Sequence, residues 1–115
     1  MLKSRKQNPP APGVHHTHYG DATVIYAIWG MLPDMIELCL ITVPEKLRRG
    51  GVAKAAMQAF LADVDQLEFS CILTAMPQDE KTDLHKLVGW YRSLGFEATG
   101  MTKHDVTMHR PARRG

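Results

Sequence analysis

A strand, a glycine turn and a helix follow one another in residues 35–67, and this succession constrains the fold more than any other part of the sequence. The strand is MIELCLITV and the helix is VAKAAMQAFLADVDQL. Amides in the first turn of a helix have no intrahelical partner, and the helix dipole adds partial positive charge there. Gly50 and Gly51 let a ligand approach the main chain, between the cationic side chains of Arg48, Arg49 and Lys54. The stretch therefore predicts a binding site for an anion such as phosphate.

The spacing of the turn excludes two common phosphate-binding motifs. The phosphate loop of nucleoside triphosphatases needs Gly, four residues and then Gly-Lys-Ser/Thr, and neither Ser nor Thr follows the glycines here. The dinucleotide fingerprint GxGxxG is also absent. Residues 48–53, RRGGVA, instead resemble the Arg/Gln-x-x-Gly-x-Gly/Ala signature of the GNAT superfamily of N-acetyltransferases, whose loop holds the pyrophosphate of acetyl-coenzyme A.

Two further segments carry the same resemblance. Residues 90–96, WYRSLGF, resemble the aromatic-Tyr-x-x-Leu-Gly-Phe segment that ends the last core helix of the family. Residues 108–111, MHRP, resemble its closing strand. The order and spacing of the three segments agree with the family, so the resemblance covers roughly residues 22 to 111.

The hydrophobic pattern predicts a β-β-α-β-α-β-β order. Residues 22–29 and 69–76 lack alternation, which predicts strands buried on both faces. Turn chemistry in residues 30–34 predicts an antiparallel hairpin with strand 35–43, and the helix over 51–67 makes a right-handed parallel crossover to the strand at 69–76. A second helix begins at Thr82 or Asp83 and closes at Gly95, and short strands follow at 96–100 and 104–110. The fold class is α/β (α+β), a mixed β-sheet flanked by helices, and the resemblance implies the GNAT acyl-CoA N-acyltransferase fold.

Composition places a single domain at residues 14–111, between a basic, Pro-rich tail at 1–13 that we expect to be disordered and a basic tail at 112–115. The net charge of +2 is uneven: three basic residues near each end leave eight against twelve acids in the body, about −4. The basic ends carry no interleaved aromatic residues, so we do not expect nucleic-acid binding.

No apolar run approaches the ~18 residues that a membrane helix needs, and the N-terminus has no apolar signal region, so we expect a cytoplasmic protein without a membrane anchor. Cys39 and Cys71 lie inside apolar strand patterns, which predicts buried, reduced thiols. The nearby His15, His16 and His18 have no Cys or acid at ligand spacing, which favours a polar strand or loop over a metal site. We expect no metal.

Glu37 is the candidate general base. Acetyl transfer needs a neutral amine and a proton for the leaving thiolate, and the resemblance implies direct attack in a ternary complex. Glu37 stands eleven residues before Arg48, the separation found for the glutamate base of histone-acetylating members. We expect Met35, Cys39 and Ile41 on the same strand face, where they would partly desolvate the carboxylate. In the alternative, Glu37 faces water near the start of its strand.

Tyr91 matches the family tyrosine that protonates the coenzyme A thiolate. A phenol suits this role because its ordinary pKa of about 10 lies above the ~8.5 of a thiol. In the alternative, Tyr91 is a packed core residue, because it continues the apolar stripe of the second helix. The asparagine common seven residues before this tyrosine in the family is Leu84 here, with Asp83 beside it.

The resemblance implies that acetyl-coenzyme A is the acyl donor and contacts two segments, one along the pantetheine arm and one at the pyrophosphate: Ile41, Thr42 and Val43, then Arg48, Arg49, Gly50, Gly51, Val52, Ala53 and Lys54. Family members carry a strand and two helices before this core, and those helices wall the acceptor site; here about twenty polar residues precede it. Either the groove is open to an amine on a peptide or protein, or a second copy forms a homodimer and supplies the wall. The other class of function is a silent acetyl-coenzyme A-binding or protein-interaction module.

Overall fold

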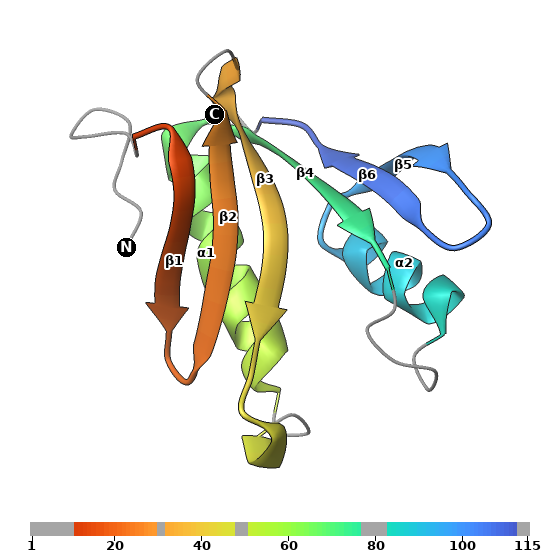
Figure 1. Ribbon diagram of the computed structural model, residues 1–115, viewed down its shortest axis with the longest axis horizontal. Helices are drawn as coiled ribbons and strands as arrows, with labels where there is room; N and C mark the ends of the chain where they lie inside the picture. The colour runs from red at the N-terminus through yellow and green to blue at the C-terminus, as the bar shows by residue number, and fades with distance from the viewer. Residues whose placement is uncertain (1–10, 30–31, 48–50, 77–82, 113–115) are drawn as a thin grey trace.

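The computed structural model describes residues 11–29, 32–47, 51–76 and 83–112, and these form one six-stranded sheet with two α-helices (Figure 1). Along the chain the elements are β1 (Gly13–Tyr19), β2 (Ala22–Trp29), β3 (Leu32–Thr42), a 3-10 turn η1 (Glu45–Leu47), α1 (Val52–Leu67), β4 (Ser70–Ala75), α2 (Leu84–Ser93), β5 (Glu97–Met101) and β6 (Val106–Arg110). The strand order across the sheet is β1-β2-β3-β4-β6-β5.

The sheet is mixed, as the sequence predicts. β2 and β3 form the expected antiparallel hairpin, and β3 and β4 are the parallel pair joined by α1. β4 and β5 each pair antiparallel with β6, and β1 pairs antiparallel with β2 along its whole length. The histidine-rich segment, for which the sequence left strand or loop open, is therefore an edge strand.

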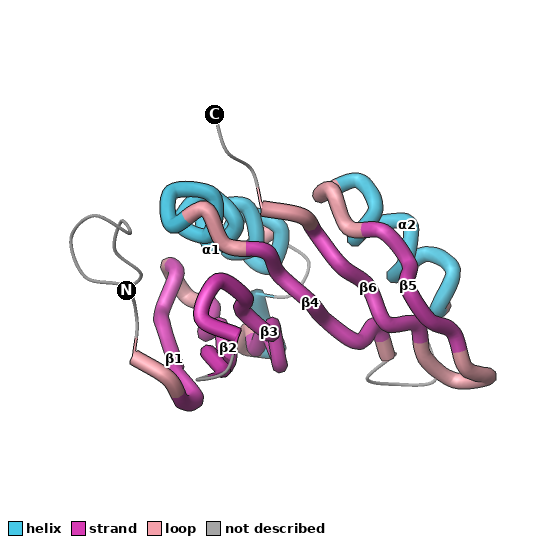
Figure 2. The backbone as a smooth tube through the Cα atoms, turned by 90° about the horizontal axis from the view of Figure 1, so that it is seen from above, coloured by secondary structure: helices cyan, strands magenta, loops and turns pink. Residues whose placement is uncertain are grey.

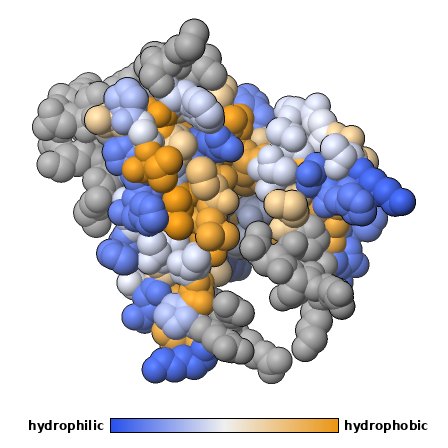
Figure 3. All heavy atoms as spheres, viewed as in Figure 1, coloured by the Kyte–Doolittle hydropathy of each residue, from blue (hydrophilic) through white to orange (hydrophobic). Residues whose placement is uncertain are grey.

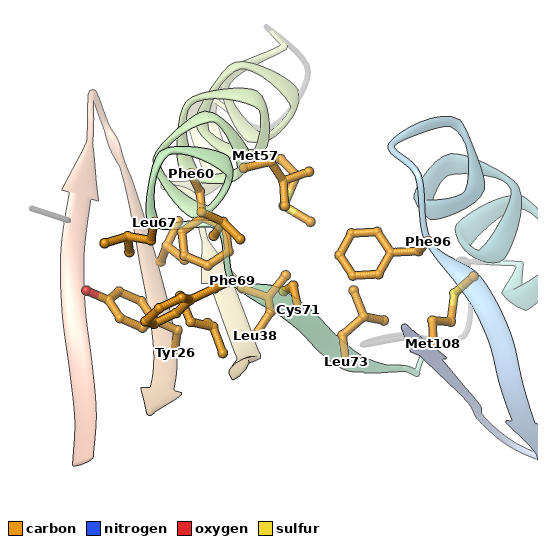
Figure 4. Close-up of a cluster of buried hydrophobic side chains, with 14 of the residues drawn as sticks. Tyr26, Leu38, Met57, Phe60, Leu67, Phe69, Cys71, Leu73, Phe96 and Met108 are labelled. Carbon is orange, nitrogen blue, oxygen red and sulfur yellow. The ribbon is translucent and has the colours of Figure 1, made fainter. Parts of the chain in front are cut away.

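Both helices lie against the same face of the sheet (Figure 2). α1 buries one full stripe: Ala56, Met57, Phe60, Leu61, Val64 and Leu67. Phe60 is fully buried, and its ring centroid lies 5.5 Å from that of Tyr26 on β2. Figure 4 shows Phe60 and Leu67 among Tyr26 and Phe69, with Phe96 beside Leu73 farther along the sheet. A single apolar core therefore joins both helices to one side of the sheet.

The opposite face of the sheet carries no helix in the described ranges, which corrects the prediction that β2 and β4 are buried on both faces. In β2 the residues facing α1 are buried, whereas Ile25 and Ala27 between them are only half-buried. Ile72 and Thr74 of β4 face the same open side. Figure 3 shows apolar side chains gathered on this open face. The apolar runs reflect high β-propensity on both faces rather than two covering layers.

α2 begins and ends as the sequence predicts. The side chain of Asp83 accepts a hydrogen bond from the amide of His85 at 2.8 Å, and the alternative cap Thr82 lies outside the described residues. Gly95, with φ of 99°, follows the C-cap Leu94. None of the described helices is long and apolar enough to cross a membrane.

Candidate active-site cleft

The cleft arises where the two parallel strands separate. β3 and β4 pair from Met35 and Ser70 as far as Leu38 and Leu73. Beyond that point β3 continues along β2, and β4 continues along β6, so the two strands diverge (Figure 1). A bulge at Cys39 starts the divergence, because Ile25 and Tyr26 of β2 face residues 40 and 38 of β3. One backbone edge of β3 after the bulge therefore faces an opening instead of a strand.

This opening is a cleft of about 230 Å³, and most of its lining is apolar. One wall is the bulged end of β3, the other is the end of β4 with α2, and Ala53 of α1 lies at its margin. The lining residues are Leu38, Cys39, Leu40, Ile41, Ala53, Leu73, Thr74, Met76, Leu87, Trp90 and Tyr91. Its shape and lining suit an extended, largely apolar chain lying along β3.

The first turn of α1 carries no acid and no side-chain cap, so its amides keep their capacity for an anion. Gly51 is the N-cap with φ of 76°, in the left-handed region that favours glycine. Ala53 reaches the cleft, Val52 is half-buried, and Lys54 is exposed. The other predicted members of this anion site, Arg48, Arg49 and Gly50, lie outside the described residues.

The segment predicted to contact the pantetheine arm ends β3 beside the cleft. Ile41 lines the cleft, Thr42 is the exposed last residue of the strand, and Val43 follows half-buried. The structure thus brings Ile41 and Ala53, from the two predicted segments, into one cavity.

Tyr91 lines the cleft from α2. Its ring packs against Phe96 with centroids 5.8 Å apart. Burial raises the pKa of the phenol, and the Cys71 thiol nearby adds to the rise, so the hydroxyl keeps its proton. The Tyr91 hydroxyl has no hydrogen-bond partner among the described residues. Every fully buried side-chain oxygen in the described ranges has such a partner, so the Tyr91 oxygen is not fully buried and can be reached from the cleft. Tyr91 both packs against the core and presents a proton donor.

Glu37 lies on the open face of the sheet, half-buried, where its carboxylate accepts a hydrogen bond from Trp29 Nε1 at 3.2 Å. It is not part of the cleft lining, although Leu38 and Cys39 beside it are. The prediction that Ile41 shares its face is wrong. Ile41 pairs with Val24 on the helix side, whereas Glu37 pairs with Ala27 on the open side, because the bulge at Cys39 reverses the alternation.

The two cysteines differ, which corrects the prediction that both are buried. Cys71 is fully buried on the helix side, and burial raises the pKa of its thiol to about 12. Cys39 is exposed at the bulge and lines the cleft. Desolvation and then the Glu37 charge raise the pKa of the Cys39 thiol. Cys39 is a site residue that the sequence pattern did not identify, because an extra residue in a strand leaves no mark in composition.

The sequence pattern did not identify two further residues of the cleft lining, one aliphatic and one aromatic. Leu87 fits the core stripe of α2, and Trp90 stands in the segment that resembles the family, yet both line the cavity. The position of Trp90 directly before Tyr91 was the available signal. Within the described ranges no three His, Cys, Asp or Glu side chains come together as a metal site.

Comparison with known structures agrees with this architecture. The anti-CRISPR protein AcrVA5 superposes with a TM-score of 0.63 at 18% identity, over 83% of this chain and 97% of that one. The ribosomal-protein-S18-alanine N-acetyltransferase of Escherichia coli superposes with a TM-score of 0.67 at 16% identity, over 92% of this chain and 74% of the enzyme. The PaiA N-acetyltransferase of Thermoplasma acidophilum, solved in complex with coenzyme A, gives 0.58 at 13% identity, over 78% of this chain and 52% of the enzyme.

The chain therefore has the GNAT-type acyltransferase fold. It spans nearly all of AcrVA5 but only about half of the PaiA N-acetyltransferase. No protein-family model matches the sequence, and no curated protein sequence matches it either.

Proposed function

We propose that this chain transfers an acetyl group from acetyl-coenzyme A to an amine. The observation that carries the proposal is the cleft opened by the divergence of β3 and β4, with the uncapped start of α1 at one end and Tyr91 in its wall. The likeness in fold to acetyltransferases, one of them solved with coenzyme A, supports it.

The anionic and apolar parts of the donor fit different parts of this site. The pyrophosphate would accept hydrogen bonds from the first-turn amides of α1, at Val52, Ala53 and Lys54, next to the basic turn of residues 48–50. The pantetheine arm, which carries amide groups, would pair with the backbone edge of Ile41 and Thr42 that faces the opening, as a short extra strand. This pairing would place the thioester near the bulge at Cys39.

In the reaction the amine nitrogen attacks the thioester carbonyl carbon, and the carbon–sulfur bond then breaks. The proton released by the amine goes to a base, for which we propose Glu37 acting from the open face, directly or through water. The coenzyme A thiolate takes a proton from Tyr91, whose raised pKa keeps it protonated until the thiolate forms. Glu37 and Tyr91 stand on opposite sides of β3, which separates the base from the acid.

The acceptor would approach from the helix-free face. Glu37 and Trp29 stand there on a surface that the described chain leaves open. An open surface accommodates an amine on a peptide or protein more readily than it encloses a small free amine. We therefore propose a peptide or protein amine as the acceptor.

Thiol release tests this function directly. The protein would be incubated with acetyl-coenzyme A and a panel of peptides bearing free α-amines or lysines, together with small amines, and free coenzyme A would be measured. We expect release that depends on a peptide amine. Firm binding of acetyl-coenzyme A without thiol release for any amine would contradict the assignment as an acetyltransferase.

A substitution tests the proposed base. Glu37→Gln should lower turnover with little change in coenzyme A affinity, and normal turnover in this variant would exclude Glu37 as the base.

A further inference from the structure

A second cavity, of about 300 Å³, lies between α2 and the β5–β6 hairpin, on the other side of α2 from the cleft. Its apolar lining consists of Leu84, Val88, Ala98, Met101 and Val106. Val106 is buried, Leu84 and Val88 are half-buried, and Ala98 and Met101 are exposed. A volume of this size is at the lower end of the range for small-molecule sites, about 300–1,000 Å³. Figures 1 and 2 both show α2 lying along this hairpin. None of these residues enters the acetyl-transfer site.

Gly89 lines this cavity, and neither the backbone nor the packing of the fold requires a glycine at this position. It stands in the middle of α2, where glycine costs roughly 0.5–1 kcal/mol of helix stability relative to alanine. Its φ is not in the left-handed region, and a Cβ placed on it would meet no atom within 4 Å. Neither backbone conformation nor packing therefore explains the glycine. Because glycine has no side chain, a ligand in the cavity could contact the backbone of α2 at this position.

The rim of the cavity is positively charged. Arg92 and Lys103 line it from opposite sides, from α2 and from the loop between β5 and β6, and His85 lines it as well. Neither Arg92 nor Lys103 forms an ion pair within the part of the chain that the structure describes. Arg92 also complements the dipole at the end of α2, but Lys103 has no comparable role. The two unpaired cations stand out because the body of the protein carries a net negative charge.

The loop that carries Lys103 is held by its own hydrogen bonds. Thr102 Oγ1 donates to Asp105 Oδ1 at 2.7 Å and accepts hydrogen bonds from the amides of His104 and Asp105. The amide of Thr102 donates to the carbonyl of Asp105 at 2.9 Å. Met101, the last residue of β5 before this loop, is 76% exposed and lines the cavity. The site is thus preorganised, with a large apolar side chain left in solvent at its rim.

We propose that this cavity binds a small amphipathic anion, an aromatic or aliphatic group that carries one carboxylate. The apolar part would fill the space over Gly89 and cover Met101, and the carboxylate would lie between Arg92 and Lys103. A guanidinium binds a carboxylate through two parallel hydrogen bonds, which suits Arg92 to this role. A volume of about 300 Å³ suits a free small molecule of this kind, and the proposal commits to such a ligand.

The position of α2 gives this site a consequence for the cleft. The same short helix presents Leu87, Trp90 and Tyr91 to the cleft and Val88, Gly89 and Arg92 to the cavity. None of its residues is fully buried and its apolar side chains are only partly covered by the core, so its position is less firmly fixed than that of α1. A ligand packed between α2 and the hairpin would hold the helix, and Tyr91 with it, in one place.

The experiment uses the full chain and 4-phenylbutyrate, which has an aromatic ring, a flexible link and one carboxylate. Binding would be followed by backbone amide NMR shifts and by calorimetry. We expect shifts concentrated at Gly89, Met101 and Lys103, with a Kd on the order of 1 mM for a ligand of about a dozen non-hydrogen atoms. The uncharged 4-phenylbutyramide has the same shape, and it should bind at least about fivefold more weakly because it lacks the charge.

Variants separate the cavity from the general surface. Gly89→Leu should fold normally, because the added Cβ meets no neighbour and leucine favours a helix, and it should reduce binding more than about tenfold by filling the space. Arg92→Gln should weaken binding about fivefold, and the matched control Lys86→Gln, an exposed cation of α2 outside the cavity lining, should change nothing. Equal binding of the amide, unchanged binding to a folded Gly89→Leu, or shifts centred on Tyr91 and Ile41 would each overturn the proposal.

Discussion

The two helices pack on the same face of one sheet, but they differ in how much of themselves they bury. α1 buries six side chains, whereas α2 buries none and leaves its apolar stripe half-exposed. Both cavities that we assign to ligands are lined by α2, and α1 contributes only Ala53 to one of them. The α1 side of the molecule therefore stabilises the fold, and the α2 side carries the surfaces to which we assign binding.

The difference follows from what each helix packs against. α1 covers β1, β2 and β3, and the inward residues of β2 are buried beneath it. α2 packs beside the line along which β3 and β4 separate, and the second cavity lies between it and the β5–β6 hairpin. Incomplete packing of a short helix costs stability, and this cost is offset by the closer packing around α1.

Two tyrosines, one on each side, give the largest expected contrast. Tyr91→Phe keeps the ring and removes the hydroxyl that we propose as the acid, so turnover should fall about 10²–10⁴-fold with little change in melting temperature. Tyr19→Phe removes a hydroxyl that donates to Asp63 at 2.7 Å beside α1, which should cost roughly 1 kcal/mol of stability and leave turnover per folded molecule intact. Thiol release and thermal unfolding on the same preparations would test both. Similar behaviour of the two variants would remove the distinction between the two sides.

Truncating one core residue on each helix tests the difference in packing. Phe60 of α1 is fully buried, so Phe60→Ala should lower the free energy of unfolding by about 3–5 kcal/mol. Leu87 of α2 is half-buried, so Leu87→Ala should cost about 1–2 kcal/mol. Urea unfolding of the two variants gives both values, and equal losses would mean that α2 is packed as firmly as α1.

An ion pair joins the two sides. Arg110 of β6, 4% exposed, donates from its two terminal guanidinium nitrogens to the carboxylate of Asp65 on α1 at 2.7 and 3.1 Å. Its Nε donates to the carbonyl of Leu94 after α2. Asp65→Asn leaves the buried guanidinium charge uncompensated and should cost about 2 kcal/mol in urea unfolding, less than for a fully enclosed pair because Asp65 is partly exposed. Adding Arg110→Met should recover part of this loss. No loss in the single variant would mean that the sheet and the core alone join the two sides.

The cysteines give the smallest expected effect. The Cys71 thiol has a pKa of about 12 in the folded protein against 9.0 for an ordinary thiol, so only the unfolded chain releases its proton just above pH 9. The free energy of unfolding should therefore fall by up to about 1 kcal/mol between pH 9 and pH 10 because of Cys71, and the tyrosines, which begin to ionise in the same range, contribute equally to the two variants compared. Urea unfolding at both pH values should show a larger loss in Cys39→Ala, which keeps Cys71, than in Cys71→Ala. The reverse order would contradict the burial of Cys71.

The sequence predicts the parts of this molecule that depend on local pattern. The hairpin of β2 and β3, the parallel crossover through α1 and the Asp83 cap of α2 each follow from periodicity or turn chemistry within a short window. The same information placed Tyr91 and Ile41 near a common site, through the family resemblance.

The parts that it could not predict depend on how distant segments meet. The bulge at Cys39 shifts one strand against its neighbour, and this shift moved Ile41 to the face opposite Glu37. Burial of the outer sheet face depends on whether another layer covers it, which β-propensity does not record. The second cavity is lined by residues of both α2 and the β5–β6 hairpin, and no pattern within either segment shows how the two meet.

Binding of coenzyme A to the start of α1 tests the central claim most directly. Calorimetry would compare the wild type with Gly51→Asp and with Gly51→Asn. Both variants place a side chain of nearly the same size at φ of 76°, so they share any backbone strain, but only Asp adds a negative charge where the pyrophosphate would lie. We predict firm binding by the wild type, moderate weakening in Gly51→Asn and a further loss of at least about tenfold in Gly51→Asp. Equal affinity in the two variants, or no binding by the wild type, would contradict the claim that this cleft holds coenzyme A.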